Sequence, residues 1–450
     1  MSETKIIPVK SYTAQKIAMW LLVLALLLIL TRIGARHYFR DEAVKAGTFP
    51  VTVARICALW AIALILLQPV LAIRNRFLDR VFGLDRLLKF HRLSGIACLI
   101  LASFHPMLMY VSGLKKLGPL ASSQWPEAIG GICIAGLWLM VVSSVWRKFL
   151  ALSYEEWLKL HKFTAPVAFV ALAHMFIIES AMRNGWLLAF WVIFLALWAG
   201  FLLAEKFVLR AQRAAGESFV VSSVAAVADG IWQIGLKPAS DAARFNFLPG
   251  QFAFISFDNP EIRHEEHPFT IASAPSDGNA LQFMIKASGD WTKKLAAVKE
   301  GNPARVSGPF GVFSAYRHEI SSLVMIAGGI GVTPMLSTLR ELSHEKSDMP
   351  IKLIWSYRNK AEAPCLDEIE SFRQPLPHFE FVKVATREQS NEKAAVKRLD
   401  KEALGNLMPE FKAGSMVMLC GPAEMMSDVR QSLRYLGYPD SVILSEEFAF

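Results

Sequence analysis

The sequence predicts a multidomain membrane protein in which a bundle of six membrane-spanning helices precedes a β-barrel-like unit and an α/β unit. Three observations support this fold class. The first half holds six apolar blocks, each near the ~20 residues that a helix needs to cross a bilayer. From about Leu209, short β-branched and aromatic runs alternate with Gly/Pro turns, which is typical of a barrel. After Ser321, strands alternate with helices, which is typical of an α/β unit.

The composition excludes several classes of protein. Of the 450 residues, 53% are hydrophobic and only 19% are charged, against about 25% charged in average usage. Such a chain is neither an ordinary soluble enzyme nor intrinsically disordered. The net charge of +9 would suit a nucleic-acid partner, but the basic residues fall between the apolar blocks and form no stripe, so membrane lipid is the expected partner and nucleic acid is not. The five cysteines include no C-x-x-C pair, which argues against a disulfide framework or zinc site.

The charges that flank the apolar blocks predict their orientation. The first block lacks a signal-peptide cleavage pattern, so we expect it to be retained as a span. With the N-terminus inside, 15 Lys and Arg residues fall on the inner side and 7 on the outer side. Because cytoplasmic loops carry the excess of Lys and Arg, both termini are predicted to be cytoplasmic. The predicted spans are Lys16–Ile33, Val51–Ile73, Leu88–Val111, Ile129–Leu150, Trp157–Glu179 and Leu187–Phe207.

Four histidines lie within two of these spans: His91 and His105 in the third, His161 and His174 in the fifth. Spacings of 14 and 13 residues separate the members of each pair by about 20 Å along a helix. Two facing helices would then hold two stacked His–His sites, His91 with His161 and His105 with His174, which suits axial ligation of two haems. Zinc is the competing metal, but it usually takes three or four protein ligands. Alternatively, each histidine only hydrogen-bonds a neighbouring helix.

Two details of the spans bear on this site. Thirteen residues leave His174 about 140° around an ideal helix from His161, so a kink is needed to bring both into register, and Pro166 between them would loosen the backbone. Arg55 opens the second span near the presumed outer surface. It could neutralise a haem propionate or attract an electron acceptor, or it could extend to lipid headgroups.

The barrel-like unit contains two segments with polar groups around aromatic ones. In His267-Pro268-Phe269-Thr270, followed by Ser273, the polar side chains could hydrogen-bond a flat heterocycle and its phosphates, although the segment could also be an ordinary barrel strand. Lys286 and the turn Gly289-Asp290-Trp291-Thr292 place a cation and a backbone turn before a helix, where a pyrophosphate could bind.

The α/β unit contains a glycine-rich turn between a strand and a helix. The run Gly328-Gly329-Ile330-Gly331-Val332-Thr333-Pro334 permits a close backbone approach; Thr333 could cap the helix and Pro334 suits its first position. The spacing differs from G-x-G-x-x-G, but the context predicts a dinucleotide site. Arg358, after the next strand, could pair with a 2′-phosphate or be a surface residue. Cys420-Gly421-Pro422 ends a later strand, and the terminal Phe450 could cover a flavin.

Taken together, these motifs resemble those of the NADPH oxidase (NOX) and ferric reductase superfamily over nearly the whole chain. The residues that carry the resemblance are the four histidines His91, His105, His161 and His174, the segments His267–Thr270, Gly289–Thr292, Gly328–Pro334 and Cys420–Pro422, and Phe450. The resemblance implies a six-helix domain with two b-type haems over residues 1–212, a ferredoxin-reductase-like FAD barrel over 213–318 and an NAD(P)H-binding α/β domain over 319–450. It also implies that Phe450 stacks on the isoalloxazine. The short segment Ser180–Trp186 between spans five and six resembles compact prokaryotic members, which implies a bacterial inner membrane.

The expected reaction is therefore oxidation of cytoplasmic NADPH through FAD and two haems, with extracytoplasmic oxygen as acceptor and superoxide as product. Arg358 favours NADPH over NADH. The alternatives are a ferric-chelate reductase on the same scaffold and, in a different class, a haem-binding membrane anchor or sensor whose nucleotide half is regulatory. The sequence does not indicate an oligomeric state.

Overall fold

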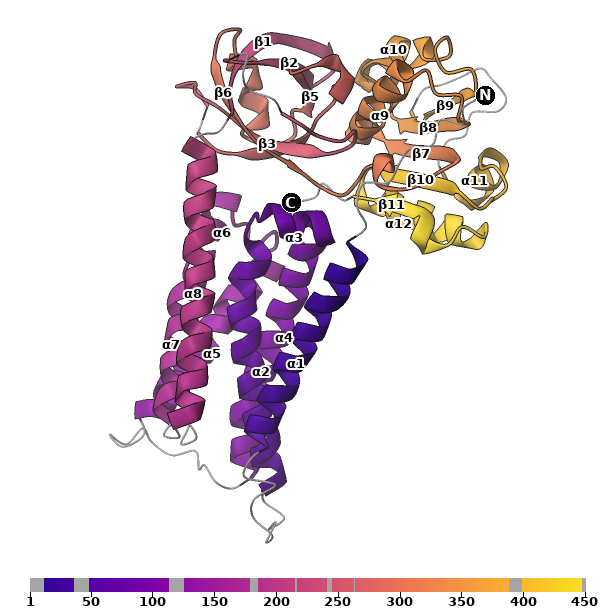
Figure 1. Cartoon of the computed structure of the whole chain (residues 1–450). Helices are drawn as coiled ribbons and strands as arrows, with labels where there is room; N and C mark the ends of the chain where they lie inside the picture. The colour runs from indigo at the N-terminus through magenta and orange to yellow at the C-terminus, as the bar shows by residue number, and fades with distance from the viewer. Residues whose placement is uncertain are drawn as a thin grey trace. The chain divides into compact units, whose positions relative to one another are not determined.

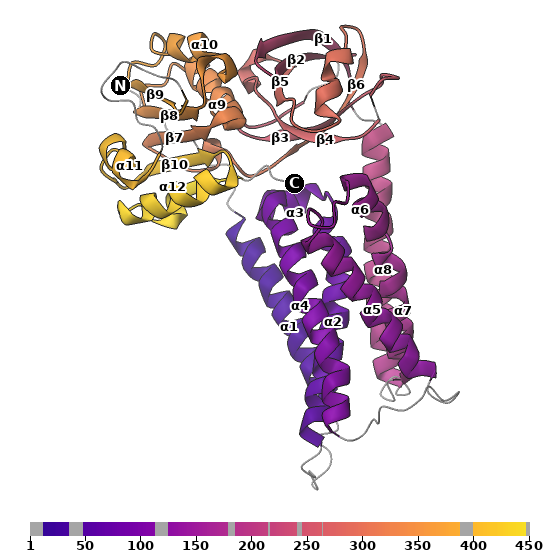
Figure 2. The ribbon, with the colours of Figure 1, turned by 180° about the vertical axis from the view of Figure 1, so that it is seen from behind.

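The computed structural model describes residues 12–35, 48–112, 125–178, 185–214, 217–240, 245–262, 264–387 and 399–446. The chain divides into two compact units. The helical unit consists of residues 13–75 and 86–207, and the sheet unit consists of residues 1–12, 76–85 and 208–450. Figure 1 and, from behind, Figure 2 show the long helices of the first unit and the two β-sheets of the second.

The helical unit confirms the six predicted spans. Its helices are α1 (Thr13–Gly34), α2 (Thr48–Ala72), α4 (Leu84–Val111), α5 (Trp125–Val145), α6 (Tyr154–His161), α7 (Thr164–Ile178) and α8 (Gly185–Ala214). Within the described residues, six stretches are long and apolar enough to cross a membrane. Apolar side chains such as Leu22 and Phe169 point outward, 71% and 72% exposed, as expected of a surface that contacts lipid. Leu30, Ile62 and Trp191 belong to the core of the bundle.

The fifth span is broken, as its proline suggested. Helix α6 ends at His161 and α7 begins at Thr164, with Pro166 in the first turn of α7. Proline has no N–H to donate and its ring clashes with the carbonyl four residues earlier, so a continuous helix through Lys162 is disfavoured. The Thr164 hydroxyl instead donates to the His161 carbonyl at 2.7 Å. The two histidines of this span therefore lie on separate helices.

The fourth span ends earlier than predicted, at Val145 rather than Leu150. Residues 146–151 form turns, and Ser153 then caps α6. The Ser153 hydroxyl accepts the Glu156 N–H while the Glu156 carboxylate accepts the Ser153 N–H, which forms a capping box. This reciprocal cap defines where the fifth span begins.

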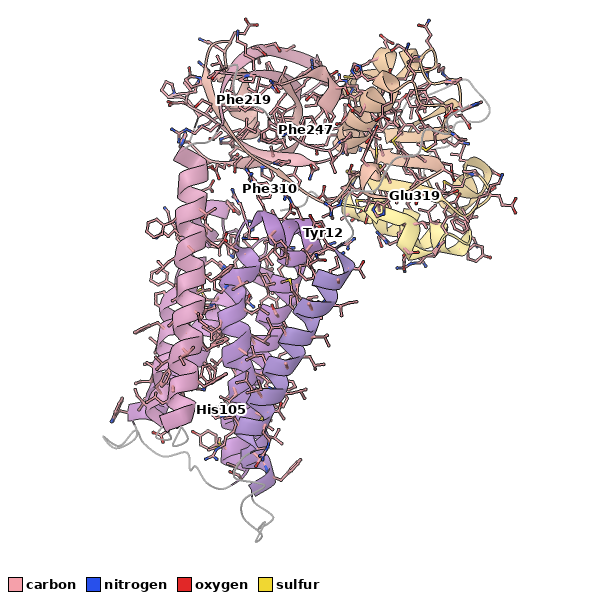
Figure 3. The ribbon with its side chains drawn as sticks, in the orientation of Figure 1. Tyr12, His105, Phe219, Phe247, Phe310 and Glu319 are labelled. Atoms are coloured by element: carbon pink, nitrogen blue, oxygen red, sulfur yellow. The ribbon has the colours of Figure 1, made fainter. Side chains whose placement is uncertain are left out.

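A six-stranded antiparallel sheet forms the barrel. Its strands are β1 (Glu217–Ala228), β2 (Ile231–Pro238), β3 (Phe252–Phe257), β4 (His267–Thr270), β5 (Leu281–Lys286) and β6 (Pro303–Phe310), in the order β4-β3-β6-β1-β2-β5. A bridge between Ile271 and Phe283 joins the two ends of this order. Phe219 and Phe247, labelled in Figure 3, lie in the barrel core. The two ends of the sheet are thus joined at this one bridge.

The last part of the chain forms a five-stranded parallel sheet with helices on both faces. The strands β7 (Ser322–Gly328), β8 (Ile351–Tyr357), β9 (Phe379–Ala385), β10 (Ser415–Cys420) and β11 (Ile443–Ser445) have the order β11-β10-β7-β8-β9. The helices are α9 (Thr333–His344), α10 (Leu366–Ser371), α11 (Lys401–Leu407) and α12 (Ala423–Tyr435). Because strand side chains alternate, Met325 packs with α9 and α10 while Val324 packs with α11 and α12. The α/β fold class is thereby confirmed.

Candidate functional site

The predicted nucleotide motifs meet at one edge of the parallel sheet. The chain runs from β7 outward to β8 and β9, and then returns to place β10 on the other side of β7. Strands β7 and β10 end together, with Ala327 opposite Cys420. In open α/β sheets, ligands bind at the carboxyl edge where the strand order reverses, so Gly328 and Gly421 flank the expected binding position.

Two glycines allow the turns after these strands to touch. A Cβ on Gly331 would lie 2.5 Å from the Cys420 carbonyl oxygen, and one on Gly328 would lie 2.6 Å from the Met425 sulfur and 2.8 Å from Pro422 Cδ. No other residue could occupy Gly331 without moving backbone. The structure thus brings Gly328, Gly331 and Cys420–Pro422 together, and this close backbone approach is what a dinucleotide site requires.

The helix after the glycine turn begins differently from the prediction. A short 3₁₀ turn, Gly329–Val332, leads directly into α9, whose first residue is Thr333. The predicted capping role of Thr333 is wrong, because the residue before the helix is Val332 and no side chain caps it. The Thr333 hydroxyl instead donates to the Ile330 carbonyl at 2.8 Å and so stabilises the 3₁₀ turn. Pro334 lies in the first turn of α9, where its missing N–H is tolerated.

Lys286 and Arg358 share one carboxylate. Glu362 Oε2 lies 3.5 Å from Lys286 Nζ and 3.7 Å from Arg358 NH1. The Arg358 side chain is 54% exposed, so it can reach a ligand at the carboxyl edge of β8. Lys286 was predicted as a cation beside the Gly289 turn, and the structure places it near Arg358 as well. Because the single carboxylate of Glu362 faces both Lys286 and Arg358, the three side chains together carry a net positive charge.

The His267–Thr270 segment forms β4, and its side chains divide between two faces. The His267 and Phe269 rings both pack on Trp291, with centroid separations of 4.3 and 5.8 Å. Trp291 itself belongs to the barrel core. Strand alternation turns Pro268 and Thr270 to the opposite face, where Thr270 is buried.

Ser273, three residues beyond β4, is also buried. Its hydroxyl accepts the Gln282 N–H at 3.2 Å, and its carbonyl accepts the Ser337 hydroxyl at 2.7 Å. The same short segment therefore contacts both the barrel and α9.

The Gly289–Thr292 turn is held in shape by one hydroxyl. Thr292 Oγ1 accepts the N–H groups of Ser288 and Gly289 at 3.0 and 2.8 Å, and donates to the Gly289 carbonyl at 3.0 Å. The six-residue 3₁₀ helix Thr292–Ala297 follows. These hydrogen bonds fix the backbone of the turn. The ring of Trp291, which belongs to the turn, packs against His267.

Sequence reasoning missed a carboxylate at the nucleotide edge. Glu446 directly follows β11, is 3% exposed, and its negative charge acts on Cys420. Burial, reinforced by Glu446, raises the pKa of the Cys420 thiol far above its ordinary value, so the sulfur stays protonated at neutral pH. No local motif signalled Glu446, because its proximity to Cys420 arises from the pairing of β10 with β11. Phe450 lies outside the described residues.

The histidines of the helical unit include one close pair. The ring centroids of His91 and His161 lie 6.0 Å apart, close to what two imidazoles need to share one metal ion at roughly 2 Å from each nitrogen. His91 Nδ1 is 3.2 Å from the Gln68 carbonyl oxygen. Because a carbonyl only accepts, Nδ1 carries the proton and Nε2 has the lone pair suited to a metal.

Ser144 orients His161 in the same way. The Ser144 hydroxyl donates its proton to the Met140 carbonyl at 2.7 Å, so its oxygen can only accept from Trp157 Nε1 at 3.0 Å and from His161 Nδ1 at 3.5 Å. The protonated Nδ1 again leaves the lone pair on Nε2. Both members of the pair therefore carry the proton on Nδ1 and the lone pair on Nε2, the arrangement that metal-binding histidines have.

His105 and His174 are held by different helices. His105 lies near the end of α4 (Figure 3), and its Nδ1 is 3.0 Å from the carbonyl oxygen of Ala54 on α2, next to Arg55. His174, on α7, packs on Gly130 of α5, where an added Cβ would be 2.7 Å from the ring. Arg55 thus occupies the level of His105. Among the described residues no group of three or more His, Cys, Asp or Glu side chains could hold a metal, so these histidines do not complete the three or four protein ligands that zinc usually takes.

A short helix that the sequence did not predict belongs to the sheet unit. Helix α3 (Arg76–Phe82) carries Asp79, which is 1% exposed and accepts the N–H groups of Leu84 at 2.8 Å and Gly311 at 2.9 Å. The Arg317 guanidinium donates to the Arg80 carbonyl at 2.7 Å. Burial raises the pKa of Asp79 to about 6, although the two amide hydrogen bonds oppose the shift. Residues 76–85 are thereby attached to the segment that follows β6.

The fold and these sites define a membrane-bound oxidoreductase with FAD- and NAD-binding domains. Residues 57–172 match the family of ferric reductase-like transmembrane components, residues 218–348 match an FAD-binding domain, and residues 325–431 match an oxidoreductase NAD-binding domain. This order of domains is the architecture of the NADPH oxidase and ferric reductase superfamily.

Three curated proteins illustrate the similarity. The chain is 25% identical over 224 residues to a propane 2-monooxygenase reductase component of Mycolicibacterium goodii, which covers 48% of this chain and 63% of that protein. It is 24% identical over 339 residues to dual oxidase 2 of Rattus norvegicus, covering 66% and 21%. It is 36% identical over 128 residues to the mitochondrial ferric reduction oxidase 8 of Arabidopsis thaliana, covering 25% and 17%. The chain therefore spans less than two thirds of each relative.

Proposed function

We propose that the chain transfers electrons from cytoplasmic NADPH across a bacterial inner membrane to oxygen, giving superoxide. The observation that carries the proposal is the His91–His161 pair, whose ring centroids lie 6.0 Å apart and whose Nδ1 atoms each face a hydrogen-bond acceptor, in a chain that also has FAD- and NAD-binding domains. Placing ionisable side chains at membrane depth costs free energy, so imidazoles paired inside membrane spans usually mark a functional site. The excess of basic residues on the inner side favours cytoplasmic termini.

In this proposal each of three domains binds one kind of cofactor: residues 1–212 the haems, residues 213–318 FAD and residues 319–450 NADPH. FAD would be held by His267–Thr270, Ser273 and Gly289–Thr292, and Phe450 would cover it. NADPH would be held by Gly328–Pro334, Arg358 with Lys286, and Cys420–Pro422. Two b-type haems would be held by His91 with His161 and by His105 with His174. When bound, flavin separates a two-electron hydride into single electrons, which haem iron can carry.

The remaining residues prepare these sites. The Gln68 carbonyl and the Ser144 hydroxyl hold the protons on Nδ1 of His91 and His161, so each imidazole presents the nitrogen that binds iron. Gly331 keeps the turn after β7 in contact with Cys420. The Cys420 thiol, kept protonated by burial and by Glu446, can donate a weak hydrogen bond but is not a nucleophile. Arg55 adds a positive charge at the level of His105, which would attract an anionic acceptor.

A ferric-chelate reductase is the second candidate. The observation that favours it is the 36% identity to the ferric reduction oxidase, the highest of the three relatives described. Its electron path would use the same residues, so only the acceptor differs. Arg55 is compatible with either acceptor.

The test compares acceptors on purified protein in detergent. A reduced-minus-oxidised spectrum first gives the haem-to-FAD ratio, for which we expect two. NADPH should then support cytochrome c reduction that superoxide dismutase suppresses. If NADPH supports Fe(III)-chelate reduction under nitrogen but no superoxide in air, the oxidase proposal is wrong and the reductase stands. A protein that binds haem and FAD yet never oxidises NADPH with any acceptor would be an anchor or sensor.

A further inference from the structure

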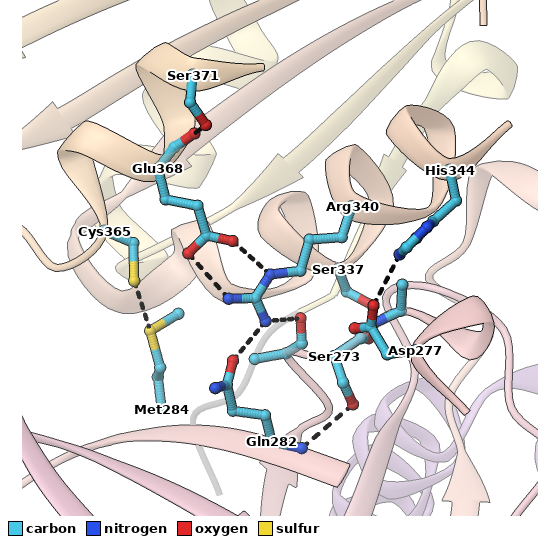
Figure 4. Close-up of polar contacts among 12 residues, drawn as sticks. Ser273, Asp277, Gln282, Met284, Ser337, Arg340, His344, Cys365, Glu368 and Ser371 are labelled. Carbon is cyan, nitrogen blue, oxygen red and sulfur yellow. Dashed lines mark hydrogen bonds and ion pairs between the residues drawn. The ribbon is translucent and has the colours of Figure 1, made fainter. Parts of the chain in front are cut away.

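Helix α9 presents a polar stripe to the segment that follows β4. The stripe consists of Ser337, Arg340, Glu341 and His344, and Figure 4 shows three of them with their partners. Spacings of three and four residues place these side chains on one face of the helix. On the buried face of an α/β domain such a stripe is normally apolar, so these polar groups need partners.

The partners lie in residues 272–277, just beyond the proposed flavin segment. The Ser337 hydroxyl donates to the Ser273 carbonyl at 2.7 Å, and Arg340 NH1 donates to the Ala272 carbonyl at 2.9 Å. Both contacts are made to backbone atoms. They therefore constrain the path of the main chain two and three residues after Thr270, whatever side chains that segment carries.

The Arg340 guanidinium is itself held in one orientation. Its Nε and NH2 donate to the two carboxylate oxygens of Glu368 at 2.6 and 2.9 Å, and NH1 also donates to Gln282 Oε1 of strand β5. The Arg340 side chain is only 14% exposed. Because Glu368 holds Nε and NH2 in the plane of the guanidinium, NH1 has a fixed direction toward the Ala272 carbonyl. A flexible lysine side chain would not provide this orientation.

Glu341 and His344 extend the same contact. The Glu341 carboxylate accepts the Ser276 N–H and the Ser276 hydroxyl, both at 2.9 Å. His344 Nε2 lies 2.7 Å from Asp277 Oδ1. Residues 272–277 are thus hydrogen-bonded at four successive points along one helix.

We propose that Arg340 is a positioning residue, which sets the flavin-binding segment at a fixed place relative to the nucleotide turn. The reason is that α9 begins directly after the Gly328–Val332 turn. One rigid helix therefore carries the nucleotide turn at its start and grips the segment after Thr270 along its length. Hydride donor and acceptor react only when they are closely aligned, and about 1 Å of misplacement can cost on the order of 100-fold in rate. The inference rests on the proposed function.

The test uses the full-length protein with three variants and a matched control. Arg340→Gln removes the fork, Arg340→Lys keeps only the charge, and Ser337→Ala removes one hydroxyl. The control is Arg373→Gln, because Arg373 also pairs with a glutamate, Glu370, at 2.8 Å, but contacts strand β9 and not the flavin segment. Each protein is compared for FAD content, melting temperature, visible circular dichroism of the bound flavin, and the anaerobic rate of flavin bleaching by saturating NADPH.

We expect Arg340→Gln to change the flavin circular dichroism and to lower the bleaching rate about 10- to 100-fold with little change in the KM for NADPH. Arg340→Lys should restore part of the rate, and Arg373→Gln should match the wild type. A rate and a spectrum for Arg340→Gln equal to those of the control would overturn the proposal. If Arg340→Gln does not fold, Ser337→Ala decides: a lower rate with altered dichroism supports the proposal, and wild-type values refute it. A wild-type protein that binds no FAD, or is not reduced by NADPH, would instead refute the proposed function.

Discussion

Gly130 offers a sharp test of His174 as a metal ligand. An alanine Cβ at Gly130 would lie 2.7 Å from Cε1 and 3.0 Å from Nε2 of the His174 ring. Ordinary contacts between carbon atoms are about 3.5–4.0 Å, so the ring would have to move by roughly 0.8 Å or more. The neighbouring Gly131 has nothing within 4 Å of an added Cβ. The pair Gly130→Ala and Gly131→Ala is therefore chemically identical but differs in its effect on the imidazole.

The displacement is large compared with what a metal bond tolerates. Metal–ligand distances hold to about 0.2 Å, so a shift of roughly 0.8 Å breaks or severely weakens the bond. Alanine is also the better helix former by about 1 kcal/mol, so neither variant should lose stability through the helix itself. Loss of haem in Gly130→Ala would then report the contact with His174 and not general unfolding.

The measurement is haem and FAD content per polypeptide after purification. We expect Gly130→Ala to keep FAD and about half of the wild-type Soret absorbance, and Gly131→Ala to keep all of it. A Gly130→Ala protein with full haem content and unchanged Soret bands would refute the assignment of His174. Equal losses in both variants would refute the geometric reasoning, because only one of the two glycines touches the ring.

Four other predictions test different parts of the molecule. His105→Leu should remove one haem's share of the Soret absorbance and stop acceptor reduction while NADPH still reduces the flavin; unchanged haem content would contradict the ligand assignment. Deletion of Phe450 should alter the KM and rate for NADPH, and identical nucleotide kinetics would count against the stacking role. Arg358→Ala should raise the KM for NADPH about tenfold and leave that for NADH nearly unchanged, since one charge-assisted hydrogen bond at an exposed site is lost; equal effects on both nucleotides would show that Arg358 does not read the 2′-phosphate. Burial raises the pKa of Asp79 from 3.8 to about 6, so its contribution to stability, about 3 kcal/mol, is fully present below about pH 4 and lost as pH rises through 6. The melting temperature of the wild type relative to Asp79→Asn should therefore fall across this range, and a constant difference would contradict the raised pKa.

The order of units was predictable because bilayer crossing and strand pairing leave strong local patterns. Apolar stretches of sufficient length predicted the six spans, and a switch from long apolar blocks to short β-branched runs predicted where the sheets begin. The boundaries were less accurate where turns are apolar. Trp146, Phe149 and Leu150 extend the fourth block beyond the helix, since hydropathy does not distinguish a span from an apolar turn that follows it.

Helix α3 was missed for a related reason. It has seven residues, too few to show a periodic pattern. In the sequence, nothing distinguishes its buried Asp79 from a charged residue on the surface. One of the two hydrogen-bond donors to the Asp79 carboxylate is Gly311, separated by 232 positions in the chain. Contacts between such distant segments depend on the tertiary fold, and no local rule predicts them.

In the candidate site, too, some residues were predictable from local patterns and others were not. Glycine-rich turns at strand ends predicted Gly328, Gly331 and Cys420, because tight turns restrict residue type. Glu446 and Arg340 carry no such restriction. The stripe at 337, 340, 341 and 344 was nevertheless visible in the sequence as polar residues at helical spacing beside apolar ones. A polar stripe on a helix expected to be buried on that face is a signal for an interface, and it would have singled out Arg340.

In the broken fifth span, helical periodicity does not fix the angle between His161 and His174. An ideal helix would turn His174 away from His161, but α6 and α7 are separate helices with separate supports. The capping box at Ser153 and the Ser144 hydroxyl determine where His161 lies. Close contact of α7 with α5, at Gly130 and again where an added Cβ on Gly136 would lie 2.8 Å from Val167, determines where His174 lies. The angle between the two imidazoles is therefore set by tertiary packing and not by helical periodicity, so the 13-residue spacing is compatible with the two proposed ligand positions.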